Sequence, residues 1–482
     1  MRRPAFAGPT RDPDAVAADL EALRSRPLIT VVMPTYETKP PHLREAIWSV
    51  TAQEYPDWEL VIVDDGSTDR STRRELGRWD AREERIVVSR LDRNSGISAA
   101  TNRAIEHSSG ELVAFLDHDD ALSADALMRM AHAFGDRDID VAYSDQDKIT
   151  TSGKRRDPFL KPDWSPVYAL GAMYVGHLLV ARRDLILESG GMAPEFDGIQ
   201  DFELLLRMSE RTDRIHHIDR VLYHWRAVPG SVALDPSEKP GIDELQARAV
   251  NEHLRRREIR ARAAPHGEIE HRLRLDPAPL DPPPLVSVVI PARGEEAWPL
   301  TPLLERTSHA RLEVIVVQPE WVGGDGGTNE SAVRVDDPGE TFNPGRAANL
   351  GAARSSGEWL LFLGEDVEVT ERNWVQRLLA HAGLPGVGAV APTLTQPDGR
   401  VDEAGLAIGL YDPVVAAMRG FPADSDGYYG SLSCAREVSA LGMVCLLIRR
   451  TDFDRVGGFE EAYSRQHQAH DLCMRLAKLG LS

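Results

Sequence analysis

An internal repeat restricts the possible folds of this chain more than any other feature of its sequence. Four landmarks of the first half return in the second half in the same order. They are PLITVVMP at 27–34 and PLVSVVIP at 284–291, ELVIV at 59–63 and EVIVV at 313–317, SSGE at 108–111 and at 355–358, and an Arg-Arg pair followed by a Gly-Gly pair at 182–191 and at 449–458. Chance similarity between apolar strands would not keep the glycine and arginine landmarks in step. Two copies of one domain are therefore the simplest explanation.

Each copy alternates short apolar runs with segments of helical period. Residues 29–33 and 59–64 are apolar without alternation, which is typical of strands buried on both faces. Between them, Leu43, Ile47 and Val50 recur at helical spacing. Strands that alternate with helices predict an α/β fold with a Rossmann-like, mostly parallel sheet covered on both sides.

The length of 482 residues also favours more than one hydrophobic core. We predict a helical N-terminal extension at 1–26, a first α/β domain at 27–240, a helical and proline-rich linker at 241–283, and a second, shorter copy of the domain at 284–482. The linker assignment depends on a helical pattern at 244–263 and on the sequence Asp281-Pro-Pro-Pro.

Charge and composition exclude several classes of protein. A formal charge of -20 repels polyanions, so we expect no nucleic-acid partner. The 3 cysteines, without a Cys-x-x-Cys pair, are too few for a disulfide framework and wrongly spaced for zinc. The first residues lack the apolar core of a secretion signal, and the longest apolar runs, near 174–181 and 441–448, have the length of core strands. We therefore expect a cytoplasmic protein, with peripheral docking on the inner membrane face still open.

Polar or acidic residues follow three of the predicted strands of the first copy. Thr35 and Tyr36 follow the first strand, Asp64 and Asp65 follow the second, and the segment 117–120 (Asp-His-Asp-Asp) follows a later one. The carboxyl ends of parallel strands meet at one edge of a sheet, where ligands of such folds collect. These segments are therefore candidates for a binding site.

The acidic segments also have ordinary structural interpretations. The sequence from Asp64 to Ser67 is a good turn and helix cap, and the residues alone do not separate that role from ligand binding. Ser123 is the better cap for the helix expected at 124–134, which leaves Asp117 and Asp119 without a capping role. Neighbouring carboxylates repel one another, and a divalent cation relieves that repulsion. Carboxylate oxygens suit Mg²⁺ or Mn²⁺, so we predict such a site here.

Two further candidates carry a weaker signal. Asp201 begins an amphipathic helix, where an acidic first turn is also expected from the helix dipole alone. His224 lies between Tyr223 and Trp225, and a lone histidine is more often a packed or surface residue than a ligand. Their significance depends on the order of all the motifs along the chain.

In that order the motifs resemble those of the family 2 glycosyltransferases, which have the A-type (GT-A) nucleotide-binding fold. The motifs are Pro34-Thr-Tyr, Asp64-Asp-Gly-Ser, Asn94-Ser-Gly with Asn102, Asp117-x-Asp-Asp, Gln200-Asp-x-Glu and Tyr223-His-Trp-Arg. The resemblance covers about residues 27–235. Two more segments, 143–148 (YSDQDK) and 161–165 (KPDWS), look like those of bacterial tandem-domain transferases of O-antigen and cell-surface polysaccharide synthesis, including rhamnosyltransferases.

The resemblance implies a nucleotide site at the first strand ends. Asp64 or Asp65 would hydrogen-bond the nucleobase, Thr35 and Tyr36 would line its pocket, and Asn94 would lie nearby.

The resemblance also implies roles for the remaining candidates. Asp117 and Asp119 would hold the Mn²⁺ or Mg²⁺ that bridges the donor diphosphate, and His224 would complete its coordination. Asp201 would be the general base of a single displacement with inversion. The implied reaction transfers a sugar from a nucleotide-sugar donor, dTDP-rhamnose or a UDP-hexose, to a glycan or lipid-linked acceptor. A homodimer stays open.

The second copy departs from the first at the candidate residues. Gln318, Gly364 and Ala469 stand where the first copy has Asp64, Asp117 and Asp201, whereas Asp366 is kept in the place of Asp119. The printed sequence ends at Ser482, before any counterpart of His224. We therefore predict a non-catalytic second copy that serves as a scaffold, an acceptor dock or a dimerisation surface.

Two other classes of function are alternatives. A sugar nucleotidyltransferase typically carries a glycine-rich, basic loop after its first strand, whereas residues 34–41 read PTYETKPP. The other alternative is a non-catalytic carbohydrate-binding or assembly protein. The first copy retains every acid that the resemblance implies, which argues against this alternative.

Overall fold

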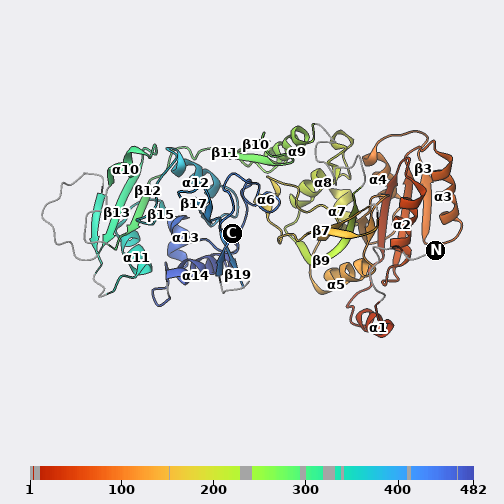
Figure 1. The fold of residues 1–482 in the computed structure, drawn as a ribbon, viewed down its shortest axis with the longest axis horizontal. Coiled ribbons are helices and arrows are strands. Elements are labelled where there is room, and N and C mark those ends of the chain that lie inside the picture. Colours follow the sequence, from red (N-terminus) through yellow and green to blue (C-terminus); the bar gives the residue numbers. More distant parts are fainter. Residues whose placement is uncertain are drawn as a thin grey trace. The chain divides into compact units, whose positions relative to one another are not determined.

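The computed structural model describes residues 4, 11–150, 152–227, 241–293, 300–318, 332–337, 341–409, 414–463 and 465–482. The chain divides into two units, one formed by residues 1–257 and 263–274 and the other by residues 258–262 and 275–482 (Figure 1). Both units are α/β structures, as the sequence predicts. Among the described residues, no helix combines the length and the apolar character that crossing a membrane requires.

A mixed β-sheet with the strand order β3-β2-β1-β4-β8-β6-β9-β5 forms the centre of the first unit, and β7 pairs with β6. The strands are β1 (Ile29–Thr35), β2 (Trp58–Asp64), β3 (Ile86–Arg90), β4 (Leu112–Phe115), β5 (Ala121–Leu122), β6 (Val141–Ile149), β7 (Arg155–Phe159), β8 (Leu179–Arg182) and β9 (Ile215–Arg226). β1 to β4 pair in parallel, whereas β8 runs antiparallel between β4 and β6. Every residue of β1 is buried, which explains its apolar sequence without alternation.

Helices connect these strands. They are α1 (Pro13–Glu21), α2 (Pro40–Thr51), α3 (Arg70–Asp80), α4 (Ile97–Glu106), α5 (Ala126–Asp136), α6 (Pro166–Ala169), α7 (Arg183–Glu188), the 3₁₀ helix η2 (Pro194–Phe196), α8 (Gln200–Ser209) and α9 (Ile242–Arg256). Leu43, Ile47 and Val50 of α2 are buried, as their spacing predicts. The predicted cap of α5 is wrong, because the Ser123 hydroxyl donates to the Asp125 carboxylate (2.8 Å) instead of accepting from the helix.

The order of the strands creates a reversal beside β1. The chain builds β2 and β3 on one side of β1, then returns through α4 and places β4 on the other side. In open α/β sheets, ligands bind at such a reversal, outside the carboxyl ends of the strands. Thr35 ends β1 and Asp117 follows β4 at this place.

The second unit repeats this arrangement around a sheet with the strand order β14-β13-β12-β15-β21-β16. The strands are β12 (Val286–Pro291), β13 (Leu312–Gln318), β14 (Ala332–Asp336), β15 (Trp359–Leu363), β16 (Ala389–Val390) and β21 (Cys445–Arg449), with the short pairs β17 (Leu394–Thr395) and β18 (Val401–Glu403), and β19 (Leu406–Ile408) and β20 (Val414–Ala416). The helices are α10 (Leu300–Glu305), α11 (Pro344–Arg354), α12 (Trp374–Ala382), α13 (Arg450–Arg455) and α14 (Arg465–Ala477). This order matches β3-β2-β1-β4-β8-β6 strand for strand, so the repeat in the sequence is a repeat of the fold.

Matching hydrogen bonds align the two units residue by residue. Arg207 of α8 donates to two backbone carbonyls of the turn after α7, and Arg475 of α14 does the same after α13. In the sheets, Arg182 and Arg449 pair with the first residues of β4 and β15. These anchors place Val444 opposite His177 and Ala469 opposite Asp201.

The first unit extends beyond the predicted boundary at residue 240. α9, which we predicted in the linker, packs against α8, with His253 Nδ1 2.8 Å from Glu210 Oε1. The chain then passes to the second unit through β10 (Ala261–Pro265) and β11 (Leu273–Pro277), which pair with each other. Helical periodicity reveals an apolar face but not the surface it packs against, so the sequence alone could not assign α9.

Candidate active site

The candidate residues of the first unit gather at the carboxyl edge of its sheet. Thr35 of β1 lies opposite Asp64 of β2, which lies opposite Arg90 of β3. On the other side of β1, Val32 pairs with Phe115, so Asp117 follows at the same edge. The parallel register therefore brings together groups that are far apart in the sequence.

A small pocket at this edge joins the candidate base to the acidic segment. Asp117, His177 and Asp201 line it, together with Gly176 and Gln200, and its volume is about 30 Å³. Such a volume holds about one or two water molecules, so the pocket is too small for a whole sugar ring. Asp117 Oδ2 lies 3.9 Å from His177 Nε2.

The acidic side chains around the pocket affect one another electrostatically. Burial raises the pKa of Asp117 above its usual value, and the nearby carboxylates of Asp119 and Asp201 raise it further. His177 and His118 act in the opposite direction on that pKa. A cation near Asp117 and Asp119 would offset the repulsion between their carboxylates.

Asp120, the third acid of the segment, has a structural role. Its carboxylate accepts hydrogen bonds from the Tyr223 hydroxyl (2.6 Å) and from the Arg226 backbone N–H (2.7 Å). Burial raises its pKa well above the usual value, and Asp119 and Asp117 add to that shift. Asp120 therefore links β9 to the acidic segment through these two hydrogen bonds.

Asp201 lies in the first turn of α8, where one of its carboxylate oxygens accepts from the Phe202 N–H (2.9 Å). It is partly exposed and lines the same pocket as Asp117. Asp119 is not among the residues that line this pocket, but its charge acts on Asp117.

The structure corrects the prediction that His224 joins the metal ligands. His224 is buried, and its Nδ1 lies 2.6 Å from Asp147 Oδ1. Its neighbours in β9, Tyr223 and Trp225, both contact His177. Because successive side chains of a strand point to opposite faces, His224 points away from the pocket. Burial lowers its pKa, while its bond to Asp147 acts in the opposite direction.

The pocket has a histidine that we did not predict, His177. It stands just before β8, inside the apolar run 174–181 that we interpreted as a core strand. A polar residue inside such a run was the available signal.

The residues predicted to bind the nucleotide lie around the ends of β1 and β2. Asp64 is buried, accepts from the Ser67 N–H (3.0 Å) and pairs with Arg90 (3.3 Å). Tyr36 and Asn94 are exposed, whereas Thr35 is buried and its hydroxyl has no hydrogen-bond partner within the described part of the chain.

Asp65 holds the segment that follows β3. Its two carboxylate oxygens accept from the backbone N–H groups of Ser95 (2.7 Å) and Gly96 (3.0 Å). The segment that contains Asn94 is thereby tied to the end of β2.

A metal site is not complete in the side chains alone. Over the described residues, no group of three or more His, Cys, Asp or Glu side chains is arranged to hold a metal ion. Mg²⁺ and Mn²⁺ are often bound by one or two carboxylates, with substrate phosphates and water supplying the remaining oxygens. Asp117 and Asp119 fit that pattern.

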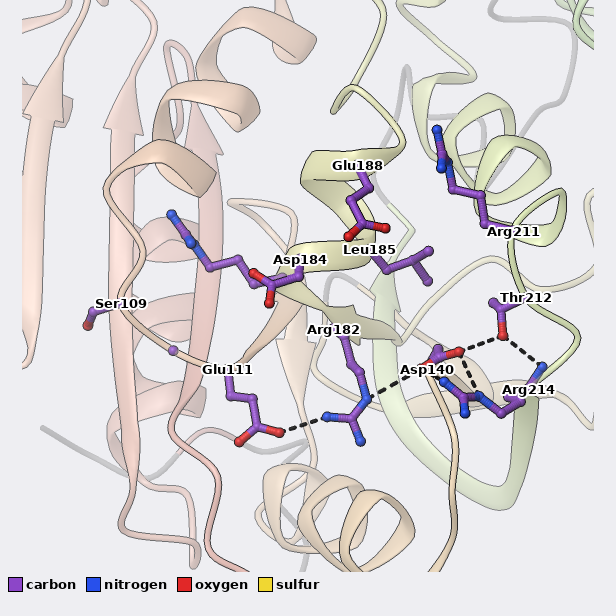
Figure 2. Close-up of a pocket in the computed structure, with 12 residues that line it drawn as sticks. Ser109, Glu111, Asp140, Arg182, Asp184, Leu185, Glu188, Arg211, Thr212 and Arg214 are labelled. Carbon is purple, nitrogen blue, oxygen red and sulfur yellow. Dashed lines mark hydrogen bonds and ion pairs between the residues drawn. The ribbon is translucent and has the colours of Figure 1, made fainter.

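A larger pocket, of about 630 Å³, lies at the opposite ends of the strands. Figure 2 shows a chain of ion pairs across it: Arg182 pairs with Glu111 (2.7 Å) and Asp140 (3.4 Å), and Asp140 pairs with Arg214 (2.7 Å). Since these charges compensate one another and join the ends of β4, β6, β8 and β9, we interpret this pocket as structural.

Comparison with known proteins gives one family match. The model of the family described as glycosyl transferase family 2 matches residues 30–181 and 287–457, one segment in each unit. The earlier resemblance to this family is thereby confirmed.

Individual relatives match nearly the whole chain. The uncharacterized protein y4gI of Sinorhizobium fredii is 37% identical over 95% of this chain and 52% of its own length. The O-antigen biosynthesis protein RfbC of Myxococcus xanthus is 34% identical over 98% of this chain and 38% of its own length. The chain thus spans about half, or less, of the length of these curated relatives.

Among solved structures, S. aureus TarS 1-349 in complex with UDP-GlcNAc aligns with 47% of this chain and 72% of its own, at 20% identity and a TM-score of 0.37.

Proposed function

The chain belongs to glycosyl transferase family 2, and from this premise we propose that its first unit is the catalytic domain of an inverting, metal-dependent glycosyltransferase. The observation that carries the proposal is the shared pocket of Asp117 and Asp201 at the reversal beside β1. Asp117, which would bind the cation, and Asp201, which would take the proton, therefore line the same pocket. Asp117 comes from the segment after β4 and Asp201 from the first turn of α8.

The nucleotide part of the donor would bind at the ends of β1 and β2. Asp64 or Asp65 would accept a hydrogen bond from the base, with Thr35 and Tyr36 beside it and Asn94 at the rim. The buried Thr35 hydroxyl, without a partner in the described chain, supports a ligand here, because buried polar groups normally have one.

Asp117 and Asp119 would hold a Mn²⁺ or Mg²⁺ ion against the donor diphosphate. The ion would supply charge stabilisation for the departing nucleoside diphosphate. The raised pKa of Asp117, caused first by burial and then by Asp119 and Asp201, supports this assignment.

Asp201 would act as the general base. Its carboxylate takes the proton of the acceptor hydroxyl, whose oxygen forms a bond to the anomeric carbon. The bond from that carbon to the phosphate oxygen breaks, and its electron pair leaves with the diphosphate. With one base and a single displacement, the product has inverted configuration.

The reaction would serve the synthesis of a cell-surface polysaccharide such as O-antigen. The likeness to an O-antigen biosynthesis protein over nearly the whole chain supports this. The proposed donors are dTDP-rhamnose and UDP-hexoses, and the acceptor is a growing glycan or its lipid-linked form. A lipid-linked acceptor would bring the enzyme to the cytoplasmic face of the membrane as a peripheral protein.

The second unit would be non-catalytic. Gly364, Val444 and Ala469 stand in the places of Asp117, His177 and Asp201, which supports a role as scaffold, acceptor dock or dimerisation surface.

The full chain should be screened with nucleotide sugars and Mn²⁺ by thermal shift, followed by an assay for released nucleoside diphosphate. We expect dTDP-rhamnose or a UDP-hexose to raise the melting temperature, since a ligand of the native state stabilises it. Release should stop with EDTA and return with Mn²⁺. Equal release with and without EDTA would contradict the metal assignment, and no shift with any nucleotide sugar would contradict the proposal as a whole.

A further inference from the structure

We propose that Glu45 of α2 is the ionic partner of buried Arg226 and thereby keeps the Arg226 guanidinium away from the Asp119 carboxylate. Glu45 is then a positioning residue of the acidic segment, although it belongs to none of the motifs that carry the family resemblance. The inference rests on the proposed function, in which Asp119 faces the cation of the donor.

Arg226 ends β9 and is tied to the acidic segment in two ways. Its Nε donates to the backbone carbonyl of Asp119 (2.5 Å), and its backbone N–H donates to the Asp120 carboxylate (2.7 Å). The side chain is only 5% exposed. An arginine keeps its charge in a protein, and a buried charge without a partner is costly. The guanidinium therefore requires an anionic group beside it.

Glu45 supplies that group. Its Oε2 lies 2.8 Å from Arg226 Nη2, which is the one ion pair of Arg226 within the described part of the chain. The contact is not an aligned hydrogen bond, since Nη2 has no hydrogen-bond partner among the described residues. Glu45 thus holds the guanidinium by its charge, which a neutral glutamine of the same shape would not replace.

The Asp119 carboxylate is the acid that would replace Glu45. The side chain of an aspartate is short, so its carboxylate stays close to its own carbonyl, which Arg226 already contacts. The Asp120 carboxylate is occupied by the Tyr223 hydroxyl and by the backbone of Arg226. Removing one partner of a buried ion pair leaves an uncompensated charge, which favours a new pair with Asp119. Such a pair would neutralise the acid that the proposed reaction uses.

His42 of α2 shows that these charges act at one place. Burial lowers the pKa of His42, and the Arg226 guanidinium lowers it further. Asp119 and Glu45 both act in the opposite direction on that pKa. The guanidinium and the two carboxylates are therefore close enough to interact around the first turns of α2.

The backbone holds α2 against the chain that follows the acidic segment. The Ser49 hydroxyl accepts from the Leu122 N–H (3.1 Å). Just beyond the end of α2, the Glu54 N–H donates to the Ala124 carbonyl (2.9 Å). The place of Glu45 relative to Asp119 is thus fixed by bonds that a substitution of its side chain does not remove.

The test measures Mn²⁺ binding to the full chain in the presence of UDP or dTDP, by electron paramagnetic resonance of free Mn²⁺. Residues behind a metal ligand typically change affinity by about 10- to 100-fold, and we expect a loss of about tenfold for Glu45→Gln. Glu75→Gln is the matched control, because it breaks an ion pair with Arg44 of the same helix (3.0 Å) that does not involve the acidic segment. The control should keep wild-type affinity even if its melting temperature falls.

The same substitution in an Arg226→Gln background separates the proposed role from a direct effect of the Glu45 charge on the cation. Without the guanidinium, Glu45→Gln should change Mn²⁺ affinity by less than about twofold, because nothing is released toward Asp119. An equal loss in both backgrounds would overturn the inference. Arg226→Met provides the same comparison if Arg226→Gln does not fold. Wild-type affinity in Glu45→Gln overturns the inference whichever Arg226 variant folds.

Asp119→Asn separates this inference from the proposed function. If Asp119→Asn binds Mn²⁺ as well as the wild type, the acid itself is misassigned, and the inference fails with it. If Asp119→Asn loses binding but Glu45→Gln retains wild-type affinity, the inference about Glu45 is overturned and the proposed function stands.

Discussion

The two units share the hydrogen bonds that hold their turns in place, and they differ in their candidate active-site residues. In the first unit the Glu59 carboxylate accepts from the Ser109 N–H (2.6 Å), and in the second Glu313 accepts from the Ser356 N–H (2.9 Å). Arg183 donates to the Ser108 hydroxyl, as Arg450 does to that of Ser355. These residues hold the turn before β4 or β15 to the sheet.

A second set of shared hydrogen bonds joins α4 of the first unit and α11 of the second to a later turn. The Asn102 side chain bonds the N–H and the carbonyl of Met192, each at 2.8 Å. Asn349 does the same with Phe459, at 2.9 Å each. These recurring residues maintain the fold, whereas Asp117, His177 and Asp201 of the pocket do not recur in the second unit.

The largest expected effect comes from Asp201, the proposed general base. Asp201→Asn should lower the transfer rate by about 10²- to 10⁴-fold, because an amide cannot take the acceptor proton. Donor binding, measured by thermal shift, should stay within twofold. The reverse change in the other copy, Ala469→Asp, should add no activity, since Gly364 and Val444 remain. Weakened donor binding with normal turnover would reassign Asp201.

The next effect concerns the acids that would hold the cation. Asp117→Asn should lower kcat/KM by about 10²- to 10³-fold at saturating Mn²⁺, since the charge on the leaving diphosphate loses its stabilisation. Asp366→Asn, at the position of the second unit that matches Asp119, should change kcat/KM by less than about twofold. A large defect in Asp366→Asn would show that the two copies share the catalysis.

The shared hydrogen bonds of Arg183 and Arg450 should contribute equally to the stability of the two units. Arg183→Met and Arg450→Met should each reduce the free energy of unfolding of their own unit by about 1–3 kcal/mol, because buried acceptors lose their donor. Urea unfolding followed by hydrogen exchange, which reports on each unit, measures this. Arg449→Met is the matched control, since that side chain is half exposed. A loss confined to one unit would contradict the structural equivalence.

The smallest effect is a pH dependence. Burial lowers the pKa of His253 below 6.5, against the effect of its bond to Glu210. As the pH falls through about 6.5, the unfolded chain binds the proton before the folded unit does, so stability decreases toward acid pH. His253→Gln should reduce that decrease in the first unit.

Burial also lowers the pKa of His470, in the second unit. His470→Gln should therefore reduce the acid sensitivity of that unit and leave the first unchanged. Urea unfolding at pH 7.5 and 5.5 gives both values, and identical pH slopes for variant and wild type would contradict the assignment.

Much of the fold could be predicted from the sequence because the information is local. Apolar runs such as that of β1 and the recurrent landmarks need no knowledge of tertiary contacts. α9 was misplaced because its contact with Glu210 depends on the path of a distant helix.

The acids that line the pocket could be selected from the sequence where they follow a strand or begin a helix. Asp117 and Asp201 could be selected because both follow or begin a recognisable element. His224 was misassigned because the contacts of Tyr223 and Trp225, which decide the face of β9, are visible only in the structure. His177 was missed because it lies inside an apolar run, and its contacts with Lys161 and Gln146 are visible only in the structure.

The hydrogen bonds of Asp65 allow nucleotide binding to be tested by amide hydrogen exchange, without an activity assay. If the nucleobase takes over the Asp65 carboxylate, the Ser95 and Gly96 amides lose their acceptor and should exchange with solvent faster when UDP or dTDP is bound. If Asp64 receives the base instead, those two amides keep their protection and the Ser67 amide loses it. The exchange rates of these three backbone amides would therefore show which of the two adjacent acids, if either, binds the nucleobase.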